Sequence, residues 1–247
     1  MYRSISTDAI VIRRERLGEF HKRLTLLTSD LGLITAAAYG AFKMQSRLRL
    51  GSEPFTCSHV LLYHDPVKRT YKVTEMEITA TFDGLQSSLS RMAAASLWAE
   101  IAQKSYGAGD LAGQLYPLLL ACLAFLNASE SAEETYVSAQ FLWRFLGLAG
   151  YQPDPEACDR CGSSLAQGAF LGGGSLLCAA CAPPGAAAIP AGALRYLDAT
   201  AGMGLEQAMA VRLDQASLQA LERALPLMVQ AILEGELTSL RWVRTRA

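Results

Sequence analysis

The sequence has no hydrophobic run long enough to span a bilayer and no phosphate-binding G-x-x-x-x-G-K-[ST] motif. Its longest apolar run, residues 115–126, includes Pro117 and is much shorter than the about twenty residues that a membrane-spanning helix needs. Residues 1–12 also lack the apolar segment of a secretory signal peptide. We therefore expect a cytoplasmic protein without ATP chemistry on a P-loop, and a buried core helix at residues 115–126.

Histidine is scarce, which limits the common catalytic sites. The three histidines, His21, His59 and His64, lie in the first third of the chain, far in sequence from the paired cysteines described below. No His-x-Glu motif and no Ser/His/Asp pattern is evident, although a triad assembled from distant segments stays open. The sequence therefore predicts a protein that is not an enzyme.

Cysteine is present in a pattern that suits a metal ion. Cys158 and Cys161 form one Cys-x-x-Cys pair, Cys178 and Cys181 form a second, and a short loop separates the pairs. Each pair can direct two thiolates at one ion, and two pairs complete a tetrahedron. We therefore predict a zinc-ribbon-like module with these four cysteines as the ligands of one Zn²⁺.

The predicted role of this ion is structural, because four thiolates fill its coordination shell. A catalytic zinc keeps three protein ligands and an open position for water, which disfavours a zinc hydrolase. Arg160, inside the first pair, can offset part of the negative charge. The alternatives are a redox dithiol, a pair of disulfides or an empty site. A chain of this length without a secretory signal does not need disulfides, and Cys57 and Cys122 are expected to be buried apolar residues.

The first third of the chain is rich in short β-type segments separated by turn signals. Ser29-Asp30-Leu31-Gly32 and Asp65-Pro66-Val67-Lys68-Arg69 are two of these turns. The predicted strands are residues 7–14, 23–28, 33–39, 56–64 and 70–79. Five short strands within about seventy residues are typical of a small barrel of the OB type.

The rest of the chain changes to helical spacing. Residues 89–106 and 111–127 are predicted helices, and Ser131-x-x-Glu134 predicts a capping box at the start of a third. Further helices are expected at residues 193–201 and from Asp214 to about 233, with a kink at Pro226. Apolar residues recur every three or four positions in the third helix, which is typical of a helix face in a core. They are Val137, Phe141, Phe145 and Leu148.

The predicted fold class is α+β multidomain, with a five-stranded OB-type β-barrel, a helical bundle and a four-cysteine zinc-ribbon-like module. The predicted nucleic-acid-binding domain is the barrel, residues 1–80. The predicted helical bundle comprises residues 81–155. The zinc module takes residues 156–184. Residues 185–247 are expected to form C-terminal helices that pack on the helical domain, with Trp242 in the tail packed on the body.

The net charge of −1 hides an uneven distribution. Residues 1–80 contain twelve Lys and Arg against eight Asp and Glu, which leaves ten against fifteen for residues 81–247. Basic residues interleaved with aromatic ones suit single-stranded nucleic acid, because cations contact phosphates and rings stack on bases. Solvated loops can have the same composition, but the barrel and the cysteine module favour nucleic-acid binding. The predicted DNA-binding residues are Arg13, Arg14, Lys22, Arg23, Lys43, Arg47 and Arg49.

Four segments of the chain resemble the bacterial recombination mediator family RecO. They are residues 9–13 with 17–19 and 24–28; residues 32–40 with Lys43, Ser46 and Arg47; residues 141–153 running into Cys158-x-x-Cys161-Gly162; and Cys178-x-x-Cys181 before a proline-containing linker. The resemblance spans residues 5–235. It implies an N-terminal OB barrel, a central helical bundle and a four-cysteine zinc module.

The resemblance also implies a function and partners. These are binding to single- and double-stranded DNA, annealing of complementary strands, contact with RecR and the single-strand-binding protein, and support of RecA loading. The chain departs from the family pattern at Phe42, where the family usually carries Arg, and at Met44, where it often carries Pro. A protein-interaction scaffold with a structural zinc ribbon is the alternative function, because residues 81–247 are acidic and rich in helices.

Overall fold

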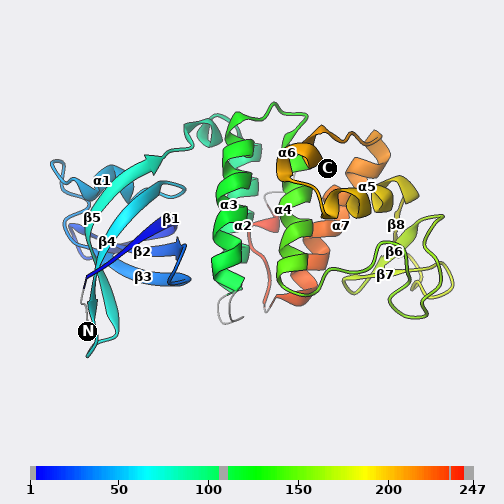
Figure 1. Cartoon of the computed structure of the whole chain (residues 1–247), viewed down its shortest axis with the longest axis horizontal. Coiled ribbons are helices and arrows are strands. Elements are labelled where there is room, and N and C mark those ends of the chain that lie inside the picture. The colour runs from blue at the N-terminus through cyan, green and yellow to red at the C-terminus, as the bar shows by residue number, and fades with distance from the viewer. Residues whose placement is uncertain (1–3, 106–110, 234, 242–247) are drawn as a thin grey trace. The chain divides into compact units, whose positions relative to one another are not determined.

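A computed structural model describes residues 4–105, 111–233 and 235–241 of the chain (Figure 1). The chain forms two compact units, Met1–Asn127 and Ala128–Ala247, which we call the N-terminal and C-terminal units. This division differs from the four predicted parts, because it falls inside the predicted helical bundle of residues 81–155. Among the described residues, no helix is long and apolar enough to cross a membrane.

Five strands of the N-terminal unit close into a barrel in the order β1-β2-β3-β5-β4. The predicted α+β class, with its OB-type barrel and four-cysteine module, is confirmed. The β3–β5 pairing that closes the barrel is parallel, whereas the other four pairings are antiparallel. A short helix, α1 (Leu48–Gly51), lies between β3 and β4. The strands are β1 (Ser4–Leu17), β2 (His21–Thr28), β3 (Leu33–Ala38), β4 (Cys57–Asp65) and β5 (Thr70–Ala80).

The first strand is much longer than the predicted residues 7–14 because it pairs with two neighbours. Its early residues pair with β4 and its later residues pair with β2. The register shifts between Val11 and Arg13, where Val11 exchanges backbone hydrogen bonds with Phe55 and Thr56. Such a bulge bends a strand, which allows one strand to serve two sides of a barrel.

Alternate residues of the strands point inward and form the barrel core. Val11, Leu24, Leu26, Val60 and Leu62 are fully buried there. Ala36 and Ala38 of β3 belong to the same core. Because side chains alternate with a period of two, the residues between them face outward, where most of the charged side chains lie.

Helices complete the N-terminal unit. A 3₁₀ turn, η1 (Asp83–Ser87), precedes α2 (Leu89–Lys104) and α3 (Leu111–Ala128). The Ser88 hydroxyl accepts a bond from the Arg91 amide at the start of α2, and the Asn127 side chain accepts one from the Gly84 amide. Both helices agree with the sequence prediction, except that the predicted end of α2 at Tyr106 lies outside the described residues.

The C-terminal unit combines a small sheet with four helices. Strands β6 (Ala169–Gly172), β7 (Ser175–Leu177) and β8 (Ala187–Ile189) form the sheet in the order β7-β6-β8. The helices are α4 (Glu134–Leu148), α5 (Ala191–Ala201), α6 (Leu205–Ala210) and α7 (Gln215–Ile232). Buried polar groups join α4 to α5, because the Gln140 amide donates to Tyr196 and Thr200 and the Trp143 indole donates to the Leu197 carbonyl.

The predicted capping box at Ser131 and Glu134 is wrong. Helix α4 begins at Glu134, and the preceding Glu133 has helical backbone angles and makes no capping bond. Glu134 is the first residue of the helix and is buried, whereas the capping box placed it in the third helical position. The Glu133 carboxylate forms an ion pair with Arg212 instead. The expected packing of Trp242 lies outside the described residues.

Candidate metal centre and nucleic-acid interface

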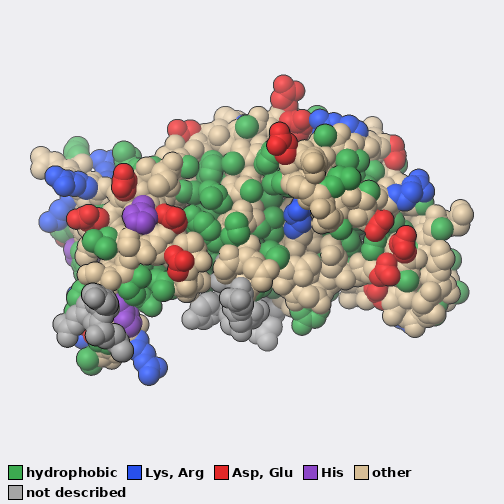
Figure 2. All heavy atoms as spheres, in the orientation of Figure 1, with side chains coloured by type: hydrophobic (Ala, Val, Ile, Leu, Met, Phe, Trp, Pro, Cys, Tyr) green, Lys and Arg blue, Asp and Glu red, His purple; other side chains and the backbone are tan. Residues whose placement is uncertain are grey.

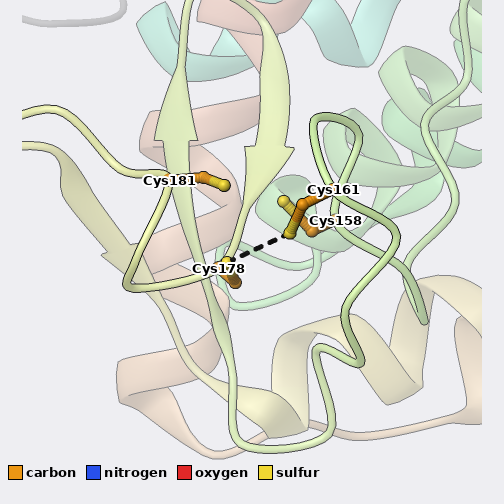
Figure 3. A group of neighbouring side chains, drawn as sticks. All are labelled: Cys158, Cys161, Cys178 and Cys181. Carbon is orange, nitrogen blue, oxygen red and sulfur yellow. Dashed lines mark hydrogen bonds between the residues drawn. The ribbon is translucent and has the colours of Figure 1, made fainter.

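The four paired cysteines meet at one point of the C-terminal unit. Cys158 and Cys161 lie on a turn before β6, and Cys178 and Cys181 lie on a turn after β7. Their sulfur atoms lie within 4.8 Å of one another and turn toward a common centre (Figure 3). The Sγ atoms of Cys161 and Cys178 are 3.7 Å apart.

Backbone hydrogen bonds shape both cysteine turns. In the first, the Gly162 amide donates to the Cys158 carbonyl at 2.8 Å, and Gly162 has a φ of +71°, which suits glycine. In the second, the amides of Cys181 and Ala182 both donate to the Cys178 carbonyl at 3.0 Å. Each turn is therefore closed by hydrogen bonds between residues that are close in the chain.

Two residues of the first turn fasten it to the second. The Asp159 amide donates to the Leu176 carbonyl at 2.9 Å, and the Asp159 carboxylate accepts from the Leu176 amide at 2.7 Å. The Arg160 guanidinium donates to the Cys181 carbonyl at 2.9 Å. Arg160 therefore lies beside the thiols, where the sequence analysis expected its charge.

The thiols have strongly perturbed acidities. Hydrogen bonds, chiefly from the Cys178 backbone, lower the pKa of Cys158 to about 6. The hydroxyl of Ser163 lowers the pKa of Cys161, whereas the neighbouring Cys161 raises the pKa of Cys181 to about 12. Neighbouring thiolates repel one another, so the four thiols do not all lose their protons easily. A bound cation offsets this repulsion and favours the thiolate form.

The arrangement suits a metal ion and not a disulfide. A tetrahedron with metal–sulfur bonds of about 2.3 Å has edges of about 3.8 Å, close to the Cys161–Cys178 distance, whereas a disulfide needs about 2.0 Å. All four thiols are free. The cluster can therefore hold a metal ion, and four sulfur ligands leave no open position for a substrate.

The second candidate site is on the barrel, where two carboxylates pair four of the seven predicted DNA-binding cations. Glu15 lies 2.9 Å from Arg13 and 3.8 Å from Arg23. Glu53 lies 2.8 Å from both Arg14 and Lys22. The three arginines are 41% to 59% exposed, so they remain accessible to a phosphate.

Lys22 differs from the other six, because its side chain is only 1% exposed. Its ammonium donates to the Arg49 carbonyl, the Ser52 hydroxyl and the Glu53 carboxylate. This burial contradicts the exposed position that we expected for Lys22. A phosphate cannot reach a group that is enclosed in this way.

Three of the predicted cations, Lys43, Arg47 and Arg49, lie exposed on the segment between β3 and β4. None of the three side chains has an ion pair among the described residues. The Lys43 ammonium lies 5.8 Å from the centre of the exposed Phe20 ring. Lys and Arg side chains gather at this end of the barrel, near α1, in Figure 2. Their positive charge is therefore available to an anion.

Aromatic rings lie among these cations. The Phe42 amide donates to the Phe20 carbonyl at 3.1 Å, which joins the β1–β2 loop to the segment after β3. Both rings are exposed, by 43% for Phe20 and 37% for Phe42. Arg16, which the prediction omitted, lies 5.8 Å from the Phe42 ring centre. The surface thus offers cations and flat apolar faces side by side.

A neighbouring group around Lys72 is not evident from the sequence. Its ammonium lies 5.8 Å from the Tyr39 ring centre and 5.7 Å from the Tyr63 ring centre. Four residues on neighbouring strands form a row across the sheet. Lys72 of β5 pairs with Tyr63 of β4 on one side and with Ala37 of β3 on the other, and Ala37 pairs with Arg23 of β2. The parallel β3–β5 pairing creates this row, and no local pattern could have revealed it.

A Ser-His-Asp row lies on the outer face of β1 and β4. The Ser6 hydroxyl is 2.6 Å from His59 Nε2, and the Asp8 carboxylate is 2.9 Å from His59 Nδ1. The sequence showed no such triad because β1 and β4 are distant in the chain. Asp8 and His59 are half exposed, and the row lies open on the sheet surface. These bonds join the outer faces of β1 and β4, where Asp8 and His59 are direct partners in the strand register.

Comparisons with known proteins identify one family along most of the chain. The family model "Recombination protein O N terminal" matches residues 1–82, and "Recombination protein O C terminal" matches residues 86–241. The chain is 31% identical to the DNA repair protein RecO of Rubrobacter xylanophilus over 85% of this chain and 88% of the relative. It is 31% identical to that of Streptomyces griseus over 78% and 80%, and 34% identical to that of Pelotomaculum thermopropionicum over 70% and 67%. The chain therefore belongs to the RecO family of DNA repair proteins.

Proposed function

We propose that this chain is a non-enzymatic mediator of DNA repair that binds DNA through its barrel. The observation that carries this proposal is the exposed segment after β3, on which Lys43, Arg47 and Arg49 have no ion-pair partner among the described residues. The exposed ring of Phe42 lies on the same segment, and the Lys43 ammonium lies 5.8 Å from the centre of the exposed Phe20 ring. Cations bind the phosphate backbone of any sequence, and exposed rings stack on unpaired bases. Family membership supports the same reading.

The proposed contacts divide into two kinds. Phosphates are bound by Arg13, Arg14, Arg23, Lys43, Arg47 and Arg49, with Lys72 as an addition. Bases of a single strand stack on Phe20, Phe42 and Tyr39. At Phe42, where family members usually carry Arg, a stacking contact replaces a phosphate contact. Because phosphates are also present on a duplex, the same cations bind double-stranded DNA.

The finer activities follow from the family resemblance. We propose that the chain anneals complementary strands and helps to load the recombinase RecA on DNA covered by single-strand-binding protein. RecR and the single-strand-binding protein are the proposed protein partners, and the cytoplasm is the proposed compartment. A surface that binds phosphates without reading bases supports annealing, because it can hold strands of any sequence.

We propose Zn²⁺ as the ion of the four-cysteine cluster and a structural role for it. Thiolates select soft metals, and a tetrahedral site with four sulfur ligands favours zinc or iron. The residues that would hold it are Cys158, Cys161, Cys178 and Cys181. Metal analysis of the purified protein identifies the ion, and a different metal would overturn the assignment.

The experiment for DNA binding is fluorescence anisotropy with a labelled oligothymidylate at several salt concentrations. With four to six of these seven cations in contact with phosphates at one time, the slope of log affinity against log salt should be about −3 to −4. Binding to a duplex of unrelated sequence is expected under the same conditions. A protein that binds no DNA, or binds it with an affinity independent of salt, would contradict the proposal.

A second candidate function, a scaffold for protein partners, is favoured by a groove of about 390 Å³ in the C-terminal unit. Strand β8 and helix α7 form its walls, which include Ile189, Ala220, Ala224 and Leu227, and Arg223 also lines it. Titration calorimetry with purified RecR and single-strand-binding protein tests this function. Ala220→Trp should fill the groove and remove such binding while DNA affinity is unchanged. Equal affinity of both forms would exclude the groove.

A further inference from the structure

The buried cation Lys22 lies directly beneath the basic segment of the barrel. Its ammonium has three N–H donors, and three acceptors meet them: the Arg49 carbonyl at 3.2 Å, the Ser52 hydroxyl at 2.7 Å and the Glu53 carboxylate at 2.8 Å. Ser52 is itself fully buried, and its hydroxyl donates to the Arg49 carbonyl at 3.0 Å. Every polar group of this small network therefore has a partner.

All three acceptors belong to one short stretch, which comprises α1 and the residues directly after it. Lys22 comes from β2, so the network fastens this stretch to the barrel wall from one side. On the other side, Val11 of β1 bonds to Phe55 and Thr56. Phe55 has a φ of +64°, a backbone conformation that a non-glycine residue keeps only when its surroundings hold it there.

The stretch that Lys22 fastens carries exposed cations of the proposed DNA surface. Arg47 precedes α1, Arg49 lies within it, and the ring of Phe42 is 5.1 Å from the Lys22 ammonium. A buried ammonium is costly unless fully paired, so these partners specify one arrangement of the segment. We propose that Lys22 is a positioning residue, which sets the arrangement of Phe42, Arg47 and Arg49 without touching DNA.

This inference rests on the proposed DNA binding for its function, but its structural part can be tested without DNA. Acetylation of lysines in the unchanged full-length protein, read by mass spectrometry, should modify Lys43 and leave Lys22 unmodified. Addition of oligothymidylate should protect Lys43 and should not alter Lys22. Modification of Lys22 in the free protein with protection by DNA would overturn the inference.

Variants separate a positioning role from a phosphate contact. Lys22→Met should weaken oligothymidylate binding at least tenfold, and Lys22→Arg should also weaken it, because a planar guanidinium does not fit three acceptors arranged around an ammonium. A phosphate contact would tolerate arginine, so full affinity of Lys22→Arg would overturn the proposal. The matched control is Lys43→Met, an exposed lysine whose loss should reduce the salt slope by about 0.7.

A double variant addresses the partner. Lys22→Met leaves Glu53 paired with Arg14 alone, and Glu53→Gln removes that charge. Because Glu53→Gln also releases Arg14, the single variant Glu53→Gln is the control against which the gain is measured. The pair Lys22→Met and Glu53→Gln should therefore recover part of the affinity that Lys22→Met loses. A double variant as weak as Lys22→Met alone would contradict the positioning role.

Limited trypsin digestion distinguishes failure of this inference from failure of DNA binding. Cleavage after Arg47 or Arg49 should be several times faster in Lys22→Met than in the unchanged protein, and the double variant should slow it again. If the unchanged protein binds no DNA, the proposed function fails, and the digestion together with the acetylation pattern still decides whether Lys22 holds the segment. Equal cleavage rates in the unchanged protein, Lys22→Met and the double variant would overturn the positioning role of Lys22.

Discussion

The barrel surface and the four-cysteine module hold their functional groups in opposite ways. On the barrel, Glu15 and Glu53 already neutralise part of the arginine charge, and Lys22 is enclosed by its own partners. In the module, backbone turns bring four thiols together, and the raised pKa of Cys181 shows how they resist joint ionisation. The barrel therefore pairs part of its charge internally and leaves Lys43, Arg47 and Arg49 exposed to an anion. The module instead gathers four thiols that can hold a cation.

The largest effect that would test this contrast is the loss of a metal ligand. Cys158→Ser should weaken metal binding by more than the roughly 10- to 100-fold that loss of an outer-shell partner causes. Stability should fall with metal content, because metal binding contributes directly to folding in such modules. Metal analysis with thermal unfolding measures both. The control is Ser164→Ala in the same module, and unchanged melting with unchanged metal in Cys158→Ser would refute the structural role.

The second test removes the unpaired cations of the barrel. Replacing Lys43, Arg47 and Arg49 by Ala should reduce the salt slope for oligothymidylate by about 2, since each contact with a single strand contributes about 0.7. The fold should persist, because these side chains are exposed. A matched control replaces Arg195 and Arg223, which are exposed on the C-terminal unit. Equal loss in the control would mean that the barrel surface has no special role.

These two tests concern features that the sequence predicted unequally well. The cysteine ligands were visible because each pair is local, and their turns form from neighbouring residues. The five strands were visible from alternation and turn signals. The burial of Lys22 was not, because it depends on Ser52 and Glu53, about thirty residues away. The same reason applies to the Lys72 group, which needs the parallel β3–β5 pairing, and to the Ser6–Asp8–His59 row.

The capping box failed for a different reason. The Ser131-x-x-Glu134 pattern is a local signal, but burial of Glu134 and the ion pair of Glu133 with Arg212 took precedence. Tertiary contacts thus overrode a local preference at the start of α4. At the predicted start of α7, in contrast, the Asp214 side chain caps the helix by accepting a bond from the Ser217 amide.

A smaller effect would sharpen the division between phosphate and base contacts. Replacing Phe20 and Phe42 by Ala should weaken binding to oligothymidylate by about 1–3 kcal/mol for each ring that stacks on a base. Duplex affinity should change little, because paired bases are not available for stacking. The control is Met44→Ala on the same segment, whose side chain is 81% exposed. Equal losses for single strands and duplex would contradict the stacking role.

The smallest expected effect concerns the Asp214 cap in the C-terminal unit. Its bond with Ser217 lowers the pKa of Asp214, so the folded state holds the proton less tightly than the unfolded chain does. The cap therefore contributes stability above the unfolded pKa of about 3.9, and this contribution disappears as the pH falls through the lower folded pKa. Asp214→Ala should lower the melting temperature slightly at pH 7. The melting temperature of this variant should also fall less on acidification than that of the unchanged protein. A parallel acid dependence in both forms would exclude this contribution.

The most direct test of the central claim is to map where a single strand lies on the full-length protein. An oligonucleotide that carries 5-bromodeoxyuridine can be cross-linked by light, and the attached residues can be identified by mass spectrometry. We expect cross-links at Phe20, Phe42 or Tyr39, on the barrel. Cross-links confined to the C-terminal unit would contradict the account.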